Sequence, residues 1–243
     1  MRGEGVVSVR EGEPTPKQAS GPAAEQGSRV GDLGASSGTA RLEAFSDGVF
    51  AVAITLLVLE LKVPPPEGVT DAAALARALA RAWPSYLGYA ISFATVGIMW
   101  ANHHHVFTFV RRSDHGLLVW NGALLFCVVL VPFSTAVLAA YLPVPDARSA
   151  AAVLYGAVFA LTGVVYNALW RHAAAGGRLL DPAVDPARVR QITRQFAAGP
   201  WVYVLATGLA LVNVWASLAV HGALAALFLV LPGGASGSNV APT

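Results

Sequence analysis

Long stretches without any charged side chain dominate the chain. Three of them, each flanked by charged residues, cover residues 82–110, 115–145 and 149–170. No charged side chain follows Arg194, and this last run is long enough for two short helices joined by a turn at residues 212–215. A helix crosses a membrane with about 20 apolar residues. The pattern therefore predicts a bundle of membrane-spanning helices.

Residues 45–63 form one further span, which is apolar but contains Asp47 and Glu60. A carboxylate inside the bilayer is costly unless it faces protein or water, so this first span should lie in the interior of the protein. The chain is thus expected to be an all-α polytopic membrane protein with six spans. They are residues 45–63, 83–110, 115–141, 149–171, 195–211 and 216–231.

The segments outside the spans have a different composition. Residues 1–38 are rich in Gly, Ser, Glu, Pro and Ala, which predicts a disordered leader, and residues 232–243 should form a flexible tail. Residues 71–82 predict a short amphipathic helix at the membrane interface. Asp185 followed by Pro186 predicts the start of another helix.

The overall composition agrees with a membrane protein. The chain is 55% hydrophobic and 12% charged, with a mean hydropathy of +0.57, whereas a soluble domain carries about 25% charged residues. The net charge of +2 without a basic stripe argues against nucleic-acid binding. The single cysteine, Cys127, excludes an intrachain disulfide and any CxxC site.

The basic residues predict the orientation of the spans. Of the 16 Lys and Arg residues, 12 lie in residues 1–44, 111–114 and 171–194, which a six-span arrangement places on one side of the membrane. Positive charge accumulates on the cytoplasmic side. We therefore expect a multi-pass protein of the cell membrane with both termini in the cytoplasm.

One face of the first span is aliphatic with a single hydroxyl. At helical spacing it consists of Gly48, Val52, Thr55, Leu56 and Leu59. Such a face is typical of ordinary helix packing, but the carboxylates in the same span favour a helix that lines an ion or substrate pathway. Composition alone leaves both interpretations open.

A specific string surrounds this face. Arg41-Leu-Glu-Ala-Phe45-Ser46-Asp47 matches the RxxxFSD signature of the transmembrane protein 175 family of potassium channels, and the segment GVFAVAITLLVLELKVP after it is also similar to prokaryotic members. Trp100-Ala-Asn-His103-His104 and the Asn213-Val-Trp215 turn fit the same family. The resemblance spans residues 40–231, which it identifies as a six-helix channel domain.

The resemblance implies a homotetramer in the lipid bilayer with the first helix of each chain around a central pore. Aliphatic rings of Val52, Leu56 and Leu59 would narrow this pore, and Thr55 would contribute to selectivity. The permeant ion would be K⁺, with other monovalent cations as further candidates, and no cofactor is implied. Val52 stands where isoleucine is common in the family, so its ring should be looser.

The resemblance also implies a polar network that supports gating by holding the pore helix in place. Its predicted members are Arg41, Phe45, Ser46, Asp47, Trp100, Asn102, His103 and His104. Arg41 and Ser46 are the expected hydrogen-bond partners of Asp47. We interpret the network as structural support and not as an ion site.

Other function classes fit the sequence less well. Neighbouring residues of a helix point about 100° apart, so His103, His104 and His105 cannot converge on one metal ion. A secondary transporter of a cation or small solute is the alternative function, although no inverted repeat is visible. A membrane-embedded enzyme ranks last, because the spans contain few carboxylates and no HExxH motif.

Overall fold

The computed structural model describes residues 22–230, with side chains from 38 to 227, and these residues are helical without any β-strand. The chain divides into two compact units, residues 1–34 and 35–243, and all contacts below lie within the second. The elements are α1 (Pro22–Leu56), the 3₁₀ turn η1 (Leu57–Glu60), α2 (Ala72–Arg81), α3 (Trp83–Phe107), α4 (His115–Tyr141), α5 (Arg148–Ala174), the 3₁₀ turn η2 (Ala175–Gly177), α6 (Pro186–Leu209) and α7 (Val214–Val230). The predicted all-α class is confirmed.

Helix α1 starts earlier than the sequence suggested. It begins at Pro22, inside the segment 1–38 that we expected to be disordered, so this boundary is corrected. Proline fits the first turn of a helix, where its missing N–H has no partner to lose. Residues 1–21 and the predicted tail 232–243 lie outside the described residues.

The first span also ends earlier than predicted. The α-helix stops at Leu56, η1 continues it to Glu60, and Leu61 leaves helical geometry with φ −81° and ψ 78°. The three prolines from Pro64 disfavour helical geometry in the residue before them, so the chain is already extended there. The predicted end at Val63 is therefore corrected to Glu60.

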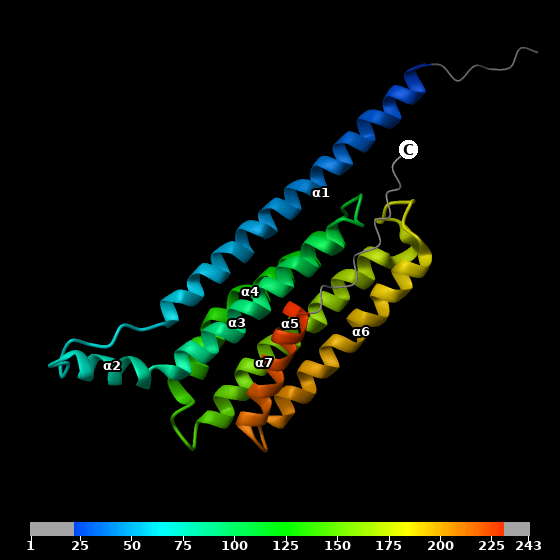
Figure 1. Cartoon of the computed structure of the whole chain (residues 1–243). Coiled ribbons are helices and arrows are strands. Elements are labelled where there is room, and N and C mark those ends of the chain that lie inside the picture. Colours follow the sequence, from blue (N-terminus) through cyan, green and yellow to red (C-terminus); the bar gives the residue numbers. More distant parts are fainter. Residues whose placement is uncertain (1–21, 231–243) are drawn as a thin grey trace, which may run out of the picture. The chain divides into compact units, whose positions relative to one another are not determined.

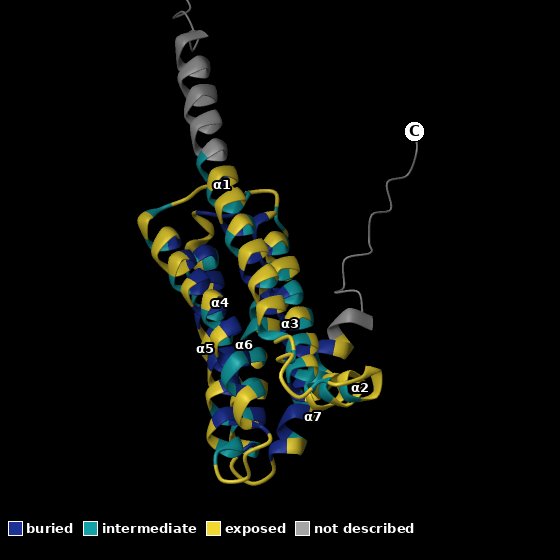
Figure 2. Ribbon diagram, turned by 90° about the vertical axis from the view of Figure 1, so that its left-hand side faces the viewer, coloured by how far each residue is buried: buried dark blue, intermediate teal, exposed yellow. Residues whose placement is uncertain are grey.

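Helices α3, α4, α5 and α6 run side by side, and α2 lies across one end of the bundle (Figure 1). Two clusters of buried apolar side chains fill the interior. One contains Phe50 of α1 with Tyr155 and Phe159 of α5, and the other contains Trp170 of α5 with Ile192 of α6. Figure 2 shows the buried residues on the inner faces and exposed residues on the outer faces of these helices.

Close backbone approach joins α5 to α6. A Cβ atom on Gly156 would collide with the side chain of Thr207, and one on Gly163 would lie 3.5 Å from Pro200. Helices in lipid associate through such close packing because lipid tails remove the hydrophobic drive between them. Gly156 and Gly163 thus belong to the surface of α5 that contacts α6.

The last two helices differ in extent from the predicted spans 195–211 and 216–231. Helix α6 begins at Pro186, where the Asp185 carboxylate accepts a hydrogen bond from the backbone N–H of Ala187 at 2.8 Å. Asn213 caps α7 in the same way through the N–H of Ala216 at 3.1 Å. The predicted Asp185 cap is confirmed, and the turn between the helices lies at residues 210–213 and not at 212–215.

Among the described residues, three segments are long and apolar enough to cross a membrane: Gly38–Glu60, His115–Tyr141 and Arg148–Gly177. Val214–Leu227 is a shorter apolar helix. Helices α3 and α6 have the length of spans but carry polar side chains such as Asn102 and Arg188. Membrane-spanning helices are therefore confirmed, and the count of six stays a prediction.

Candidate functional site

One face of α1 is fixed against the bundle. Ser46, Phe50, Ala53 and Leu57 recur at helical spacing, and each has 0% of its surface exposed. Side chains of α3 and α4 contact this part of α1, and both helices also pack against η1. This face determines how α1 is rotated, because turning the helix would break all of these contacts together.

The opposite face of α1 is uncovered in the single chain. Phe45 is 65% exposed, Val52 54%, Leu56 41% and Leu59 68%. These are the residues that the sequence placed in the pore face, apart from Phe45, which was placed in the network. Leu59 lies on η1, where three residues per turn align its side chain more directly above Leu56 than an α-turn would.

Thr55 is the hydroxyl on this face. Its Oγ1 donates a hydrogen bond to the backbone carbonyl of Val52 at 2.9 Å, and the residue is exposed. A hydroxyl has one hydrogen and two lone pairs. With the hydrogen bonded to its own helix, Thr55 presents only acceptor lone pairs outward, which suits a cation and not an anion.

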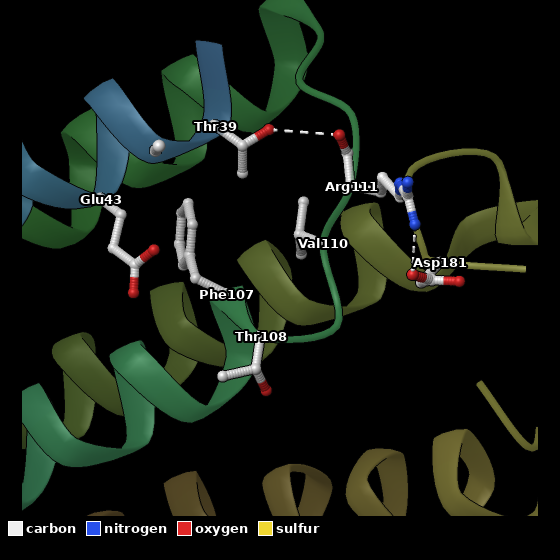
Figure 3. Close-up of a pocket in the computed structure, with 8 residues that line it drawn as sticks. Thr39, Glu43, Phe107, Thr108, Val110, Arg111 and Asp181 are labelled. Atoms are coloured by element: carbon white, nitrogen blue, oxygen red, sulfur yellow. Dashed lines mark hydrogen bonds and ion pairs between the residues drawn. The ribbon is translucent and has the colours of Figure 1, made fainter. Parts of the chain in front are cut away.

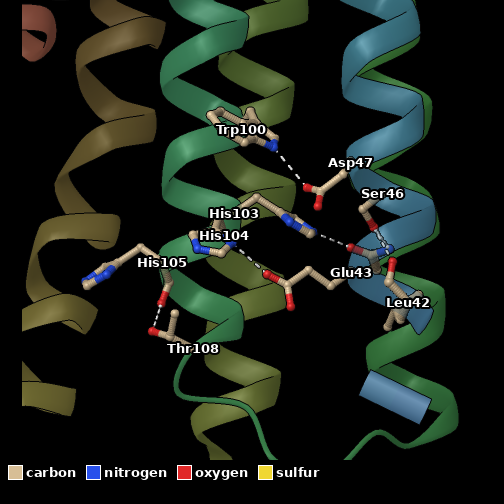
Figure 4. A network of polar contacts seen from close by, with 10 residues as sticks. Leu42, Glu43, Ser46, Asp47, Trp100, His103, His104, His105 and Thr108 are labelled. Atoms are coloured by element: carbon tan, nitrogen blue, oxygen red, sulfur yellow. Dashed lines mark hydrogen bonds and ion pairs between the residues drawn. The ribbon is translucent and has the colours of Figure 1, made fainter. Parts of the chain in front are cut away.

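Two carboxylates of α1 bind side chains of α3. The Trp100 indole donates to Oδ1 of Asp47 at 2.9 Å, and Nδ1 of His104 lies 2.8 Å from Oε1 of Glu43 (Figure 4). Asp47 and Glu43 are one helical turn apart, as are Trp100 and His104, so the two contacts form parallel rungs between the helices.

A second set of contacts connects α1 to α4 and has a defined direction. The Ser46 hydroxyl donates to the Leu42 carbonyl at 2.8 Å, so it must accept the hydrogen bond from Nδ2 of Asn121 at 2.9 Å. Oδ1 of Asn121 then accepts from Nε2 of His103, also at 2.9 Å. The buried Nδ1 of His103 has no partner in the described chain. These contacts select the tautomer with hydrogen on Nε2.

Three predicted network residues lie elsewhere, and one of them is Phe45 on the exposed face of α1. Arg41 is exposed and has no hydrogen bond or ion pair within the part of the chain that the structure describes, so the expected pairing of Arg41 with Asp47 is wrong. Asn102 faces away from α1 and lines a groove between α3, α5 and α6. Arg41 precedes Asp47 by six residues, so the two side chains leave α1 in directions about 120° apart.

Glu43 and Asn121 are the partners that sequence reasoning missed. Asn121 is a lone amide in the apolar span 115–141, and Glu43 precedes Asp47 by four residues on one helix face. Both signals were readable, since a polar group inside an apolar span must find a partner.

The three consecutive histidines reach three different environments. His103 binds Asn121, His104 binds Glu43 and His105 lines the groove on the other side of α3. Among residues 38–227 no group of three His, Cys, Asp or Glu side chains is placed to hold a metal ion.

The middle of α1 is held by a contact with the loop after α3. Thr39 donates to the carbonyl of Arg111 at 3.4 Å, and Arg111 pairs with Asp181 at 2.9 Å beside a cavity of about 210 Å³ (Figure 3). The backbone N–H of Ala183 and then the Arg111 guanidinium hold the pKa of Asp181 below its usual value. The cavity is small and its polar groups already bind one another, so we assign it an anchoring role.

Comparison with known proteins gives consistent matches. The family described as endosomal/lysosomal potassium channel TMEM175 matches residues 41–132, which contain the α1 face and its partners on α3 and α4. A potassium channel of Chamaesiphon minutus is 48% identical over 190 residues, covering 78% of this chain and 93% of the relative. A potassium channel of Streptomyces collinus is 46% identical over 185 residues, covering 76% of this chain and 88% of the relative.

The fold is also similar to a solved structure. The crystal structure of a lysosomal potassium-selective channel TMEM175 homolog from Chamaesiphon minutus superposes with a TM-score of 0.72 at 45% sequence identity. The similarity covers 79% of this chain and 97% of that chain. It thus includes the bundle as a whole and not the α1 segment alone.

Proposed function

Because the chain belongs to the TMEM175 family, we propose that it is a potassium-permeable channel in which four copies surround a central pore lined by α1. The relatives named potassium channels support the ion, and their coverage of nearly the whole bundle supports the same architecture here. Such a protein is a passive conductor and not an enzyme. The number four comes from the family resemblance and is part of the proposal.

The uncovered face of α1 carries this proposal. Its aliphatic side chains and the outward lone pairs of Thr55 lie opposite a face that the bundle holds at fixed rotation. This pore-forming face occurs once per chain, so a closed conduit around it requires several copies on a symmetry axis.

Rings of Val52, Leu56 and Leu59 would control conduction. A narrow aliphatic ring excludes water, so an ion must shed part of its hydration shell to pass. The Thr55 hydroxyl, one turn from Val52 and Leu59, offers four oxygen acceptors per tetramer at this depth. We assign selectivity to the combination of ring size and these oxygens.

The contacts behind α1 would support the open and closed positions of the pore helix. Trp100, His104 and Asn121 bind three different side chains of α1, so any rotation of α1 must exchange these partners. We therefore assign this network a positioning role, and Glu43 and Asn121 join it.

We further propose that the protein lies in the cell membrane with both termini in the cytoplasm and works without a bound cofactor. The apolar helices support the membrane, and the distribution of Lys and Arg supports the orientation.

Purified protein in liposomes tests the function. A K⁺ gradient should drive a flux that does not saturate and exceeds the Na⁺ flux under the same gradient. Native mass spectrometry should show four copies. Saturable uptake that depends on a second ion would instead indicate a secondary transporter, and a functional monomer would refute the shared pore.

A further inference from the structure

A second concave surface lies away from α1. A groove of about 700 Å³ runs between α3, α5 and α6. Its volume is within the range that holds amphiphilic ligands of drug size or the upper part of a lipid. This groove is not part of the proposed pore.

The groove is on the side of α3 that faces away from α1. Successive helix residues turn by about 100°, so Ile98, Asn102 and His105 point roughly opposite to Trp100. The first three line the groove, whereas Trp100 binds α1. Figure 4 shows His105 on the other side of α3 from Glu43 and His104. With α1 at the pore axis, the groove opens away from that axis.

One end of the groove is basic and polar. Arg188 at the start of α6 and His105 near the end of α3 line it and interact electrostatically, and Gln195 lies two turns further along α6. Arg188 also donates to Gln191 at 3.1 Å, which holds its guanidinium at this end. No acidic side chain lines the groove among the described residues.

The remainder of the groove is apolar and open. Phe196, Pro200 and Tyr203 line it from α6, and Ile98 lines it from α3. Gly97 and Gly199 also line it, and a Cβ atom on either glycine would meet nothing within 4 Å. A larger side chain at either position would therefore extend into open space.

A buried hydroxyl without a partner adjoins this space. Tyr166 lines the groove and is 7% exposed, and its hydroxyl has no hydrogen-bond partner in the described chain. Nearly all buried polar groups in proteins are hydrogen-bonded, so an orphaned hydroxyl indicates an absent acceptor. An ester oxygen is an acceptor that an apolar chain can bring to this position.

We propose that the groove binds an anionic phospholipid, one molecule per chain. The phosphate lies at the Arg188 end, an ester oxygen accepts from Tyr166, and an acyl chain occupies the space beside Gly97 and Gly199. A zwitterionic lipid fits the apolar part equally but brings a cationic group to the basic end. Charge therefore favours phosphatidylglycerol over phosphatidylcholine.

Native mass spectrometry with matched acyl chains tests the headgroup. Arg188→Gln should weaken retention of phosphatidylglycerol about five-fold, the equivalent of about 1 kcal/mol for one basic residue near a lipid phosphate, and leave phosphatidylcholine unchanged. Arg190→Gln is the matched control, because Arg190 is exposed and does not line the groove. Equal loss in both variants would refute the assignment.

Filling the groove tests the acyl chain. Gly199→Leu should remove the bound lipid of either headgroup, and Gly97→Leu should do the same from the opposite wall. Gly208→Leu on the same helix should retain it, because Gly208 also has nothing within 4 Å but lies outside the groove. Retention in both groove variants would overturn the proposal, and Arg188→Gln still tests it if a leucine variant fails to fold.

Two further measurements distinguish a bound phospholipid from other occupants of the groove. Glycerol 3-phosphate should not displace the lipid, and displacement would indicate a site for a soluble anion. The groove variants should keep the oligomeric mass of the wild type. A change of that mass would show that a second copy covers the groove, which would also overturn the lipid assignment.

Discussion

The indole nitrogen of Trp100 lies 2.9 Å from Oδ1 of Asp47 and joins the middle of α3 to α1. This contact stands one turn above the pair of His104 and Glu43. It takes the acceptor that Arg41 was expected to use. Asp47 therefore binds a neutral donor on a neighbouring helix and leaves the cation of its own helix exposed.

The link between Trp100 and Asp47 should be measurable as an interaction energy. Trp100→Phe and Asp47→Leu should each lower the stability of the detergent-solubilised protein. Because both remove the same hydrogen bond, the double variant should cost less than the sum by about 1 kcal/mol. Thermal unfolding of the four proteins measures the difference, and strict additivity would show that the contact contributes nothing.

Asn121 should be the most sensitive polar position of the network. Asn121→Leu removes the hydrogen-bond acceptor of His103 Nε2–H and the donor to the Ser46 hydroxyl. The buried Nδ1 of His103 already has no hydrogen-bond partner in the described chain. A buried unsatisfied donor costs about 1–3 kcal/mol. Asn102→Leu, on the far side of α3, should leave unfolding unchanged. Equal unfolding temperatures for both variants would contradict the contacts.

Leu56 and Leu57 provide a matched pair of neighbours. Leu56 is 41% exposed on the proposed pore face, whereas Leu57 is fully buried. Leu56→Ala should raise K⁺ conductance or lower selectivity in bilayer recordings with little change in stability. Leu57→Ala should cost about 2–5 kcal/mol of stability and leave the conductance of folded channels unchanged. The reverse pattern would show that the face with Leu57 lines the pore, and it would contradict the assignment of the face with Leu56.

Thr55 tests the role of an oxygen on the pore face. Thr55→Val keeps the shape and removes the oxygen, so the ratio of K⁺ to Na⁺ permeability should fall. Thr55→Ser keeps the oxygen and should retain the ratio. Reversal potentials under bi-ionic conditions give both values, and an unchanged ratio in Thr55→Val would assign selectivity to the aliphatic rings alone.

Asp114, which caps α4 outside the spans, should make the stability of the folded chain depend on pH under acidic conditions. The backbone N–H of Leu117 and then His172 lower the pKa of this carboxyl in the folded chain. Its stabilising effect is therefore complete above the ordinary carboxyl value of about 3.9 and is lost as the pH falls through the lower folded value.

The variant Asp114→Asn separates this charge from the cap itself. Asparagine still accepts from the backbone N–H but does not titrate in this range. The unfolding temperature of the wild type should decline more steeply than that of Asp114→Asn below about pH 3.9. Parallel curves would assign the acid sensitivity to other groups.

Much of the fold could be predicted from charge-free runs because the bilayer demands long apolar helices. The start of α4 at His115 was readable for this reason, whereas the Asp185 cap was readable from the proline that follows it. Hydropathy alone placed the α6 span only from residue 195, because the first turns of α6 carry Arg188 and Arg190 and extend beyond the apolar run. Hydropathy marks the part of a helix in lipid and misses the turns that project from it.

The site was predicted less completely than the fold. Motif residues on one helix, such as Val52 and Leu56, could be placed on one face from spacing alone. Partners across helices depend on rotation and depth, which spacing does not determine. Trp100 reaches Asp47 from another helix, and only the packed geometry shows that contact.

The hydrogen bonds from His103 through Asn121 to Ser46 have a fixed direction, and this direction also prevents proton transfer along them. A carboxamide cannot hand a proton from its oxygen to its nitrogen side without passing through a costly imidic acid. Asn121 therefore blocks proton transfer between the ring of His103 and the hydroxyl of Ser46. The buried amide connects three helices without forming a proton relay.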